Sequence, residues 1–370
     1  MEFPATLALS AQSKYKRSDL FYVYERFRKS HNIEVISPIF SNQWIKLWKI
    51  FVSPKGFIWL FLRLPFKLLR GKYSLFVAHC RDPQAIITII ISKLLRKPTI
   101  ISDSGYMWIK GDIRGSLLWP FSRFVCFQST YLNVSSFRVR NFWVSAGIPA
   151  EKIRVNYTFT SVLKPNRKTS AKALEIEKKL GYKKIVLFVG RLIKEKGIDY
   201  LIRAFAKFSG FKDLGLLIVG DGPERNRLQK LCEESNLSNV VFIWHPNERT
   251  EIEPYFVLCD ILVLPSITLK EPEEWGLVVN EAMSVGKPVV VSSSVGCAYE
   301  LVKNAVNGYI VQEKNVDALF LAMEKLIIND ELRLQMGNEA KKTIANQFTY
   351  LHSIDSLSRL HQEAMKKLVS

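Results

Sequence analysis

The feature that most constrains the fold is a regular alternation of short apolar runs with longer stretches of helical character. In the second half of the chain, each apolar run is rich in Val, Ile or Leu and ends at Gly, Pro or a polar turn. These runs occupy residues 185–189, 216–219, 240–243, 261–264 and 289–291. After the first run, apolar side chains recur at helical spacing: Ile198, Leu201, Ile202, Phe205 and Phe208. This order predicts parallel βαβ units in an α/β doubly wound sheet.

The first half of the chain repeats this alternation. Strand-like runs lie at residues 5–10, 33–39, 75–79 and 99–102, with helical stretches at 18–29 and 83–95. The polar stretch 161–170 contains Pro165 and is typical of a linker. A chain of 370 residues is long enough for about two domains. We therefore expect an N-terminal domain over 1–165, a C-terminal domain over 166–349, and a last helix at about 350–370 that returns to the first domain.

The net charge is +19, and it is unevenly distributed. Residues 1–165 hold 25 Lys and Arg against 8 Asp and Glu, whereas the remainder is nearly neutral. The two halves are therefore expected to face different partners. A hydrophobic fraction of 48% and a charged fraction of 24% exclude a wholly disordered chain, a fibrous repeat and a polytopic membrane protein.

Cysteine usage indicates the compartment. The five cysteines form no C-x-x-C pair, and several lie in apolar runs: Cys80, Cys126, Cys232, Cys259 and Cys297. We expect reduced, buried thiols in a cytosolic protein, with no disulfide framework and no zinc site. The first residues lack a basic region before an apolar one, and no apolar run approaches the roughly 20 residues of a membrane span. We therefore predict neither a secretory signal nor a transmembrane helix.

Three loops that follow predicted strands carry residues suited to chemistry, because ligands of parallel sheets bind beyond the carboxyl ends of the strands. The first loop is Gly190-Arg191-Leu192-Ile193-Lys194-Glu195-Lys196-Gly197. Gly190 permits a sharp turn, Arg191 can bind phosphate oxygens in two places, and Lys196 adds a point charge beside a helix N-terminus. A solvated turn explains this loop about as well as a phosphate site does.

The second loop is Gly220-Asp221-Gly222-Pro223-Glu224. It begins like a dinucleotide fingerprint, but Arg225 stands where the third glycine belongs, and no acidic residue follows at the expected strand end. A dehydrogenase is therefore disfavoured, and we interpret Gly220 as part of a tight turn that lets a ligand approach the backbone.

The third loop leads into a helix that begins after Gly276 and ends near residue 286. Its sequence is Glu273-Glu274-Trp275-Gly276-Leu277-Val278-Val279-Asn280-Glu281-Ala282-Met283. Amides around Gly276, Leu277 and Val278 can cap a phosphate, and a carboxylate accepts hydrogen bonds from sugar hydroxyls. Glu281 suits a ribose diol and Glu273 a second sugar. A helix start enriched in Glu by the helix dipole alone is the plainer explanation.

Taken together, the loops resemble the nucleotide-sugar-binding domain of the retaining glycosyltransferases often called family four, which have the GT-B fold. The resemblance covers about residues 183–330. The matching motifs are G-R-L-x-x-x-K-G at 190–197, V-G-D-G-P at 219–223, D-x-x-V-x-P-S at 260–266, E-x-W-G-L-V-V-N-E-A-M at 273–283 and G-x-P-V-V at 286–290.

The resemblance implies two Rossmann-like domains facing a central cleft and assigns roles to individual residues. Arg191 and Lys196 would hold the donor diphosphate with Gly190, Gly220 and the Trp275–Val278 segment around it. Glu281 would hold the ribose and Glu273 the transferred sugar, while residues 243–246 would border the base. It also implies front-face attack with retention, in which the leaving diphosphate takes the acceptor proton, and no required metal or other cofactor. A UDP-sugar is the favoured donor.

The resemblance fades in the first half. The glycine-rich loop expected after the first strand is replaced by Ala11-Gln12-Ser13-Lys14, and Ser104 stands where many members have His. Asp103 can face the cleft and orient an acceptor hydroxyl, or it can be a capping residue. His79 ends a predicted strand nearby, where a structural role is the more common one.

The basic half also carries a distinctive segment. From residue 35 to 81 there is no acidic residue, and cations alternate with aromatic side chains over 44–70. This mixture suits an anionic membrane surface, although a helix packed into the core with solvated lysines has the same composition. We therefore expect a peripheral enzyme on the inner face of the cytoplasmic membrane that glycosylates a glycan or lipid-linked glycan of the lipopolysaccharide type.

Two alternatives stay open. One is a nucleotide-sugar hydrolase or epimerase of GT-B fold, and the other is a non-catalytic or nucleic-acid-binding protein on the same scaffold. No helix-turn-helix, RNP-like or zinc signature supports a nucleic-acid partner. The sugar, the base, the acceptor, the linkage and the oligomeric state are not encoded in any motif recognised here.

Overall fold

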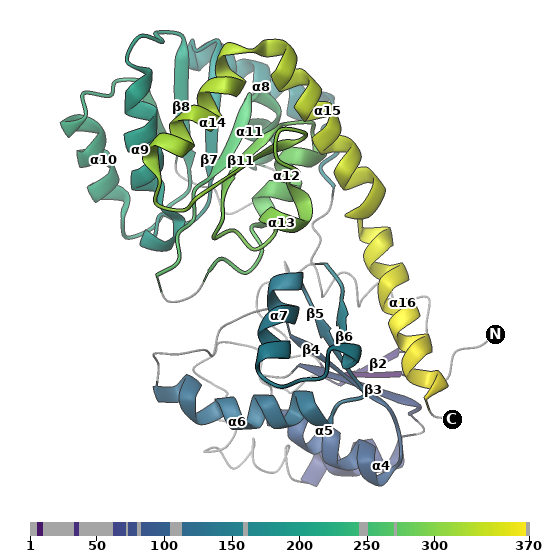
Figure 1. The fold of residues 1–370 in the computed structure, drawn as a ribbon. Helices are drawn as coiled ribbons and strands as arrows, with labels where there is room; N and C mark the ends of the chain where they lie inside the picture. Colours follow the sequence, from purple (N-terminus) through teal and green to yellow (C-terminus); the bar gives the residue numbers. More distant parts are fainter. Residues whose placement is uncertain are drawn as a thin grey trace. The chain divides into compact units, whose positions relative to one another are not determined.

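The computed structural model describes residues 6–9, 33–36, 62–71, 73–79, 83–103, 113–157, 162–243, 251–269 and 272–367. The chain divides into two compact units (Figure 1). Unit 1 comprises Met1–Phe159 and Tyr350–Ser370, and unit 2 comprises Thr160–Thr349. The features predicted at residues 11–14, 18–29, 44–61, 104–105 and 244–246 lie outside the described residues.

Unit 1 is built on a parallel sheet with the strand order β2-β1-β3-β4-β5-β6. Its strands are β1 (Thr6–Leu9), β2 (Ile33–Ile36), β3 (Leu75–His79), β4 (Thr99–Asp103), β5 (Tyr131–Val134) and β6 (Ile153–Val155). Its helices are α4 (Leu64–Arg70), α5 (Pro83–Leu94), α6 (Ile113–Gln128), α7 (Phe137–Ser145), the short 3-10 helix η3 (Ala150–Lys152), and α16 (Tyr350–Lys366).

Alternate strand residues of unit 1 enter two separate cores, because successive side chains of a strand point to opposite faces. On one face, residues such as Phe76, Ile101 and Leu132 pack with buried side chains of α4, α5, α6 and α7. On the other face, neighbours such as Val77 and Ile100 pack with Leu360 and Ala364 of α16. The final helix therefore completes the sandwich of unit 1.

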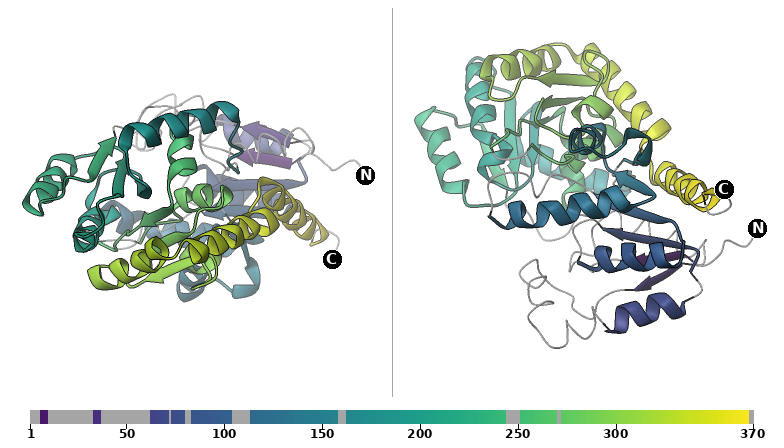
Figure 2. Two further views of the ribbon diagram at one scale, coloured as in Figure 1. Left: turned by 90° about the horizontal axis from the view of Figure 1, so that it is seen from above. Right: turned by 60° about the horizontal axis from the view of Figure 1, so that its bottom comes forward.

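Unit 2 repeats this plan, with helices packed around a sheet (Figure 2). The strands of this parallel sheet have the order β12-β11-β10-β7-β8-β9. Its strands are β7 (Lys184–Val189), β8 (Leu214–Val219), β9 (Val240–Ile243), β10 (Ile261–Leu264), β11 (Val289–Ser292) and β12 (Gly308–Val311). Its helices are α8 (Arg167–Leu180), η4 (Lys194–Lys196), α9 (Ile198–Phe205), η5 (Ala206–Phe208), α10 (Arg225–Glu234), α11 (Glu253–Leu258), α12 (Leu277–Ser284), α13 (Ala298–Leu301), α14 (Val316–Ile328) and α15 (Asp330–Gln347).

The strand order of unit 2 fixes where a ligand site can form. The first strand of the unit, β7, lies between β10 and β8, so the chain builds outward from β7 in both directions. The central strands are buried over nearly their whole length, as expected for a parallel sheet covered on both faces. The reversal of strand order beside β7 is the topological switch point, where the loops after neighbouring strands diverge and leave room for a ligand.

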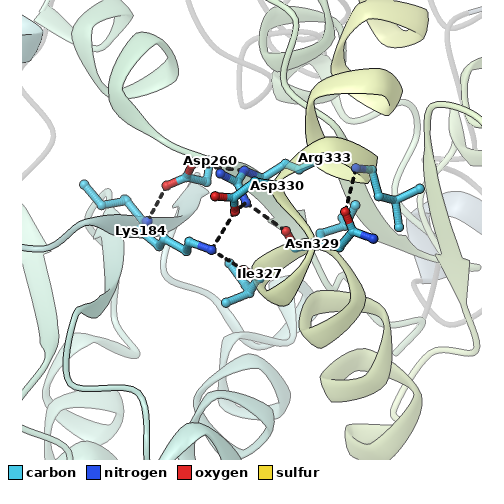
Figure 3. A network of polar contacts seen from close by, with 9 residues as sticks. Lys184, Asp260, Ile327, Asn329, Asp330 and Arg333 are labelled. Atoms are coloured by element: carbon cyan, nitrogen blue, oxygen red, sulfur yellow. Dashed lines mark hydrogen bonds and ion pairs between the residues drawn. The ribbon is translucent and has the colours of Figure 1, made fainter.

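A polar network ties the amino-terminal edge of this sheet to α15 (Figure 3). Asp260, just before β10, accepts a hydrogen bond from the Ile185 amide at 2.7 Å and forms an ion pair with Arg333 Nε at 3.1 Å. Lys184 Nζ and Arg333 Nη1 both donate to Asp330 Oδ1, at 2.6 and 2.7 Å. These hydrogen bonds hold the pKa of the Asp330 carboxyl at about 2, well below its ordinary value. The network joins β7, β10 and α15.

The predicted fold class is confirmed: both units are α/β layers on a parallel sheet. The predicted linker at 161–170 was too long. Asn166 caps α8 by accepting the Thr169 amide at 2.9 Å, so the helix already begins at Arg167. The division by contacts lies at Thr160, close to the expected boundary. No helix among the described residues is long and apolar enough to cross a bilayer.

Candidate active site

The loops that follow β7 and β8 are joined to each other at the carboxyl edge of the unit 2 sheet. The Leu192 amide donates to the Asp221 carbonyl at 2.9 Å, and the Glu224 amide donates to the Leu192 carbonyl at 3.0 Å. A Cβ atom on Gly220 would lie 1.8 Å from the Gly190 carbonyl oxygen, so the two backbones meet at a distance that only glycine permits. The predicted tight turns at Gly190 and Gly220 thus form one backbone platform.

The β7 loop presents two predicted cations in different environments. Arg191 is exposed and follows Gly190 directly, whereas Lys196 ends the η4 turn with a side chain only 17% exposed. The turn is held against the loop after β10, because the Ile267 amide donates to the Glu195 carbonyl at 2.8 Å. Lys196 is therefore fixed in position, whereas Arg191 can reorient toward an anion.

Glu273 is the residue on which the β7 and β10 loops converge. One carboxylate oxygen accepts a hydrogen bond and ion pair from Lys196 Nζ, and the other accepts a hydrogen bond from Ser266 Oγ. The Glu273 amide donates to the Ser294 carbonyl at 3.1 Å, which anchors the backbone to the loop after β11. The carboxylate is only 16% exposed, so both oxygens are oriented by neighbours.

Ser266 was not predicted as a site residue. It stands at the end of β10, is buried, and receives a hydrogen bond on its carbonyl oxygen from Ser292 Oγ. Beside it, Thr268 Oγ1 and Ser294 Oγ lie 3.0 Å apart. The available signal was the P-S ending of the motif at 260–266, which placed a hydroxyl beside the third loop.

Helix α12 begins where the third loop ends, as predicted. Gly276 has a φ of +93°, and a Cβ atom there would lie 2.9 Å from side chains of Leu264 and Val295. The amides of Leu277 and Val278 stand in the first turn, where no preceding turn supplies carbonyl partners. Glu281 lies one turn further along the same helix and is partly buried.

Trp275 was predicted to line the donor site. Its ring is 4% exposed, and its indole Nε1 donates to Asn280 Oδ1 at 2.8 Å. The carbonyl of Trp275 accepts the Cys297 amide at 2.8 Å. These contacts give the side chain a packing function at the start of α12, so any contact with a donor comes from the backbone of this residue.

Asp103 ends β4 in unit 1 and is 4% exposed. Its Oδ2 accepts a hydrogen bond from Trp143 Nε1 of α7 at 2.7 Å. This contact links sheet and helix within unit 1 and accounts for a buried carboxylate there. A contact between Asp103 and an acceptor stays a prediction.

Four of the five cysteines lie in the described residues, and all four are buried, as expected: Cys126, Cys232, Cys259 and Cys297. Burial raises the pKa of Cys259 to about 12 and that of Cys232 to about 11, so neither thiol is suited to act as a nucleophile at neutral pH. Within the described ranges, no three His, Cys, Asp or Glu side chains gather as a metal site would require.

A comparison of the sequence with known protein families shows which family unit 2 is similar to. Residues 170–343 match the family model described as "Glycosyl transferases group 1". The matched segment contains all the strands of the unit 2 sheet and the loops that follow β7, β8, β10 and β11. It leaves out the polar stretch before α8. Over residues 170–343, unit 2 is therefore similar to the group 1 glycosyltransferases.

Curated relatives agree with this similarity. The chain is 34% identical to an uncharacterized glycosyltransferase of Methanocaldococcus jannaschii, over 50% of this chain and 46% of the relative. It is 30% identical to the alpha-D-kanosaminyltransferase of Streptomyces kanamyceticus, over 59% of this chain and 56% of that protein. The chain thus spans about half the length of the curated relatives it matches.

Among solved structures, the chain resembles Anabaena HepE, which was solved in complex with UDP. The TM-score is 0.75, with 97% of this chain and 100% of that chain covered. The sequence identity is 19%, so the likeness concerns the fold, which is GT-B.

Proposed function

We propose that this protein is a retaining glycosyltransferase that moves a sugar from a nucleoside diphosphate donor to a glycan or lipid-linked glycan. The observation that carries the proposal is the convergence of Lys196, Glu273 and Ser266 at the switch point of a unit similar to the group 1 glycosyltransferases. A lysine oriented by a carboxylate, in the same loop as the exposed Arg191, is a site for an anionic leaving group.

The donor would be held by its diphosphate. Arg191 and Lys196 supply two positive charges, and the first-turn amides of Leu277 and Val278 supply hydrogen-bond donors at the positive end of a helix dipole. Glu281, further along α12, would accept hydrogen bonds from the ribose hydroxyls. UDP is the favoured nucleotide, and the UDP complex of Anabaena HepE supports this choice by analogy of fold.

The chemical step builds negative charge on the leaving diphosphate while the sugar becomes oxocarbenium-like. Lys196 and Arg191 stabilise that charge, and this electrostatic effect is the main protein contribution that we propose. Glu273, held by Lys196 and Ser266, orients the hydroxyls of the transferred sugar. The acceptor oxygen attacks from the same face, and its proton passes to the departing diphosphate oxygen. With two side-chain cations on the diphosphate, we propose that no metal is required.

We assign the acceptor to unit 1, at the inner face of the cytoplasmic membrane. The support is the charge asymmetry, because the first 165 residues hold 25 basic and 8 acidic residues while the remainder is nearly neutral. A lipid-linked or lipopolysaccharide-type glycan presents phosphates that such a domain attracts. A nucleotide-sugar hydrolase or epimerase on the same fold is the second candidate, since the donor site alone would serve it equally.

The test uses the purified full chain and a panel of UDP-, GDP- and ADP-sugars, each with and without a membrane lipid extract. We expect release of the nucleoside diphosphate from one donor only when the extract is present, and unchanged release in EDTA. The anomeric configuration of the product, read by NMR, reports retention. Release that is equally fast without the extract identifies a hydrolase, and a donor that isomerises without release identifies an epimerase.

A further inference from the structure

Three helices of unit 1 form one continuous layer on the sheet. Helix α5 contacts α4 on one side and α6 on the other, and all three send buried side chains into the same core (Figure 1). Leu68 of α4, Ile89 of α5 and Val125 of α6 are each no more than 2% exposed. The opposite sides of these helices are therefore one outward face, which we call the α4–α6 face.

The outward positions on this face are apolar. Six large side chains, two on α4, one on α5 and three on α6, are between 46% and 72% exposed: Phe66, Leu69, Leu94, Phe121, Phe124 and Phe127. On α6 the three phenylalanines recur every third residue, so they lie along one side of the helix. Exposed apolar side chains on three adjacent helices, four of them phenylalanines, are far more than the scattered apolar residues of an ordinary surface.

The charged residues of the same helices are all basic. Helices α4, α5 and α6 contain no Asp or Glu, and Arg63 precedes α4 directly. The Arg70 guanidinium lies 4.3 Å from the centre of the Phe66 ring, and Lys152 lies 5.4 Å from that of Phe127. Cations thus flank the exposed rings, as in segments that insert rings at the level of lipid headgroups.

The surface beside α4 is hollowed. A hollow of about 490 Å³ is lined by Arg63, Phe66, Lys67, Arg70, Gly71 and Tyr73. Three of its six lining residues are cations and none is acidic, so the hollow suits an anionic group attached to an apolar body. A phospholipid with its phosphate here and its acyl chains along Phe66 has that chemistry.

We propose that the α4–α6 face is the surface through which the protein docks on an anionic lipid bilayer, with Arg63, Lys67 and Arg70 binding lipid phosphate. The proposal rests on the membrane location in the proposed function. It names the surface that binds the bilayer, where the sequence indicated only a segment. It extends the predicted segment 44–70 to α5 and α6, which the sequence pattern did not single out. Charge complementarity favours a lipid bilayer as the partner. A face with exposed rings, whose three helices contain only basic charged residues, matches lipid headgroups over acyl chains.

The experiment is flotation of the full chain with vesicles of phosphatidylcholine alone or mixed with phosphatidylglycerol. We expect binding that needs phosphatidylglycerol and weakens with salt, since such attraction is screened over roughly 10 Å at moderate ionic strength. The triple variant Arg63→Gln, Lys67→Gln, Arg70→Gln should lower vesicle affinity on the order of 100-fold. The triple variant Leu94→Ser, Phe121→Ser, Phe124→Ser should lower it about tenfold or more, and this loss should persist at high salt.

Unit 2 offers matched controls. Lys172, Lys178 and Lys179 are three exposed cations on the single helix α8, and replacing them with Gln removes the same charge from another surface. Leu174, Leu321 and Leu334 are more than half exposed on three unit 2 helices, and replacing them with Ser removes comparable apolar area. Both controls should float like the wild type, and thermal unfolding should confirm that every variant is folded.

Vesicle binding requires neither donor nor acceptor, so its failure is distinct from failure of glycosyl transfer. A wild type that does not float with phosphatidylglycerol vesicles overturns the docking proposal, even if it releases nucleoside diphosphate. Equal losses in the unit 1 variants and the unit 2 controls overturn it as well. Dimers of the wild type that the Leu94, Phe121, Phe124 variant dissociates, without any vesicle binding, would identify the face as a contact between copies of the chain.

Discussion

At the scale of single residues, Lys196 has a better defined position than Arg191, the other cation proposed for the diphosphate. Its ammonium pairs with Glu273 and lies on a turn that hydrogen bonds to the β10 loop. Because it would stabilise charge that grows on the leaving diphosphate, we predict that Lys196→Ala lowers transfer about 100-fold or more. Arg191→Ala should lower it similarly. The measurement is nucleoside diphosphate release by the purified variants.

Lys194 provides the control for this prediction. It lies in the same η4 turn, is exposed, and has the same charge. Lys194→Ala should therefore release nucleoside diphosphate at nearly the wild-type rate. If Lys196→Ala also did so, the assignment of the β7 loop to the diphosphate would be wrong.

The two glutamates of the third motif should respond differently to the loss of charge. Glu281→Gln removes the charged acceptor proposed for the ribose hydroxyls, so we predict weaker binding of UDP by calorimetry. Glu273→Gln should leave UDP binding largely intact and reduce turnover, because this carboxylate is proposed to face the transferred sugar. Glu195→Gln, an exposed neighbour in the β7 loop, serves as the control. UDP binding that is normal in the Glu281 variant would contradict the ribose assignment.

The residues of this site were predictable where a local motif contains them, but the contacts between these residues were not. Lys196 and Glu273 were both singled out from short motifs, but their pairing joins positions 77 residues apart and depends on the strand order. Ser266 was missed because a serine at a strand end has no distinctive spacing. The hydrogen bond from the Trp275 indole to Asn280 was not predictable either. An aromatic residue in a ligand-binding loop can contact the ligand or pack inside the protein.

At the scale of elements, the network of Asp330 with Lys184 and Arg333 makes part of the stability depend on pH. The folded-state pKa of Asp330 is about 2, against an ordinary value of 3.8, because both cations hydrogen bond to the ionised form. Such a depressed pKa contributes stability that is fully present above about pH 4. The contribution is lost as the pH falls from about 4 through 2.

We therefore predict that Asp330→Asn lowers the unfolding temperature of unit 2 at neutral pH. The difference from the wild type should shrink as the pH is lowered from 4 toward 2. Asp317→Asn is the control, because it removes an exposed ion pair with Lys207 that lies outside this network. A difference between wild type and Asp330→Asn that stays constant down to pH 2 would contradict the assignment.

Element boundaries followed the sequence closely where strands are uniformly apolar. The predicted runs at 240–243 and 261–264 coincide with β9 and β10, and that at 185–189 is β7 without its first residue. Strands β5, β6 and β12 were not predicted. Polar side chains interrupt β5 at Asn133 and β6 at Arg154, and β12 begins with Gly308, so tertiary pairing determines these strands.

At the scale of the whole molecule, the fold class was predictable because strand and helix patterns alternate along the entire chain. The division into two units is also marked by charge. Two leucines of α16 test the assignment of this helix to unit 1. Leu360 is 3% exposed and packs on the sheet, whereas Leu351 is 63% exposed.

We predict that Leu360→Ala destabilises unit 1 by about 2–5 kcal/mol, since it leaves a cavity against β3, β4 and β5. Leu351→Ala should change stability by no more than about 0.5 kcal/mol. UDP should raise the unfolding temperature of unit 2 equally in both variants. Equal effects of the two substitutions on unit 1, measured by denaturant unfolding, would show that α16 does not cover the sheet.

The return of α16 to the first sheet also sets an order of events during synthesis. The strands of unit 1 leave the ribosome first, yet the helix that covers Leu75, Val77, Ile100 and Tyr131 is translated only after all of unit 2. One apolar side of the unit 1 sheet therefore stays uncovered in the nascent chain until unit 2 has been synthesised. A premature stop anywhere in unit 2 leaves that side uncovered, so a truncated chain is exposed to aggregation and proteolysis even though its first 159 residues are intact.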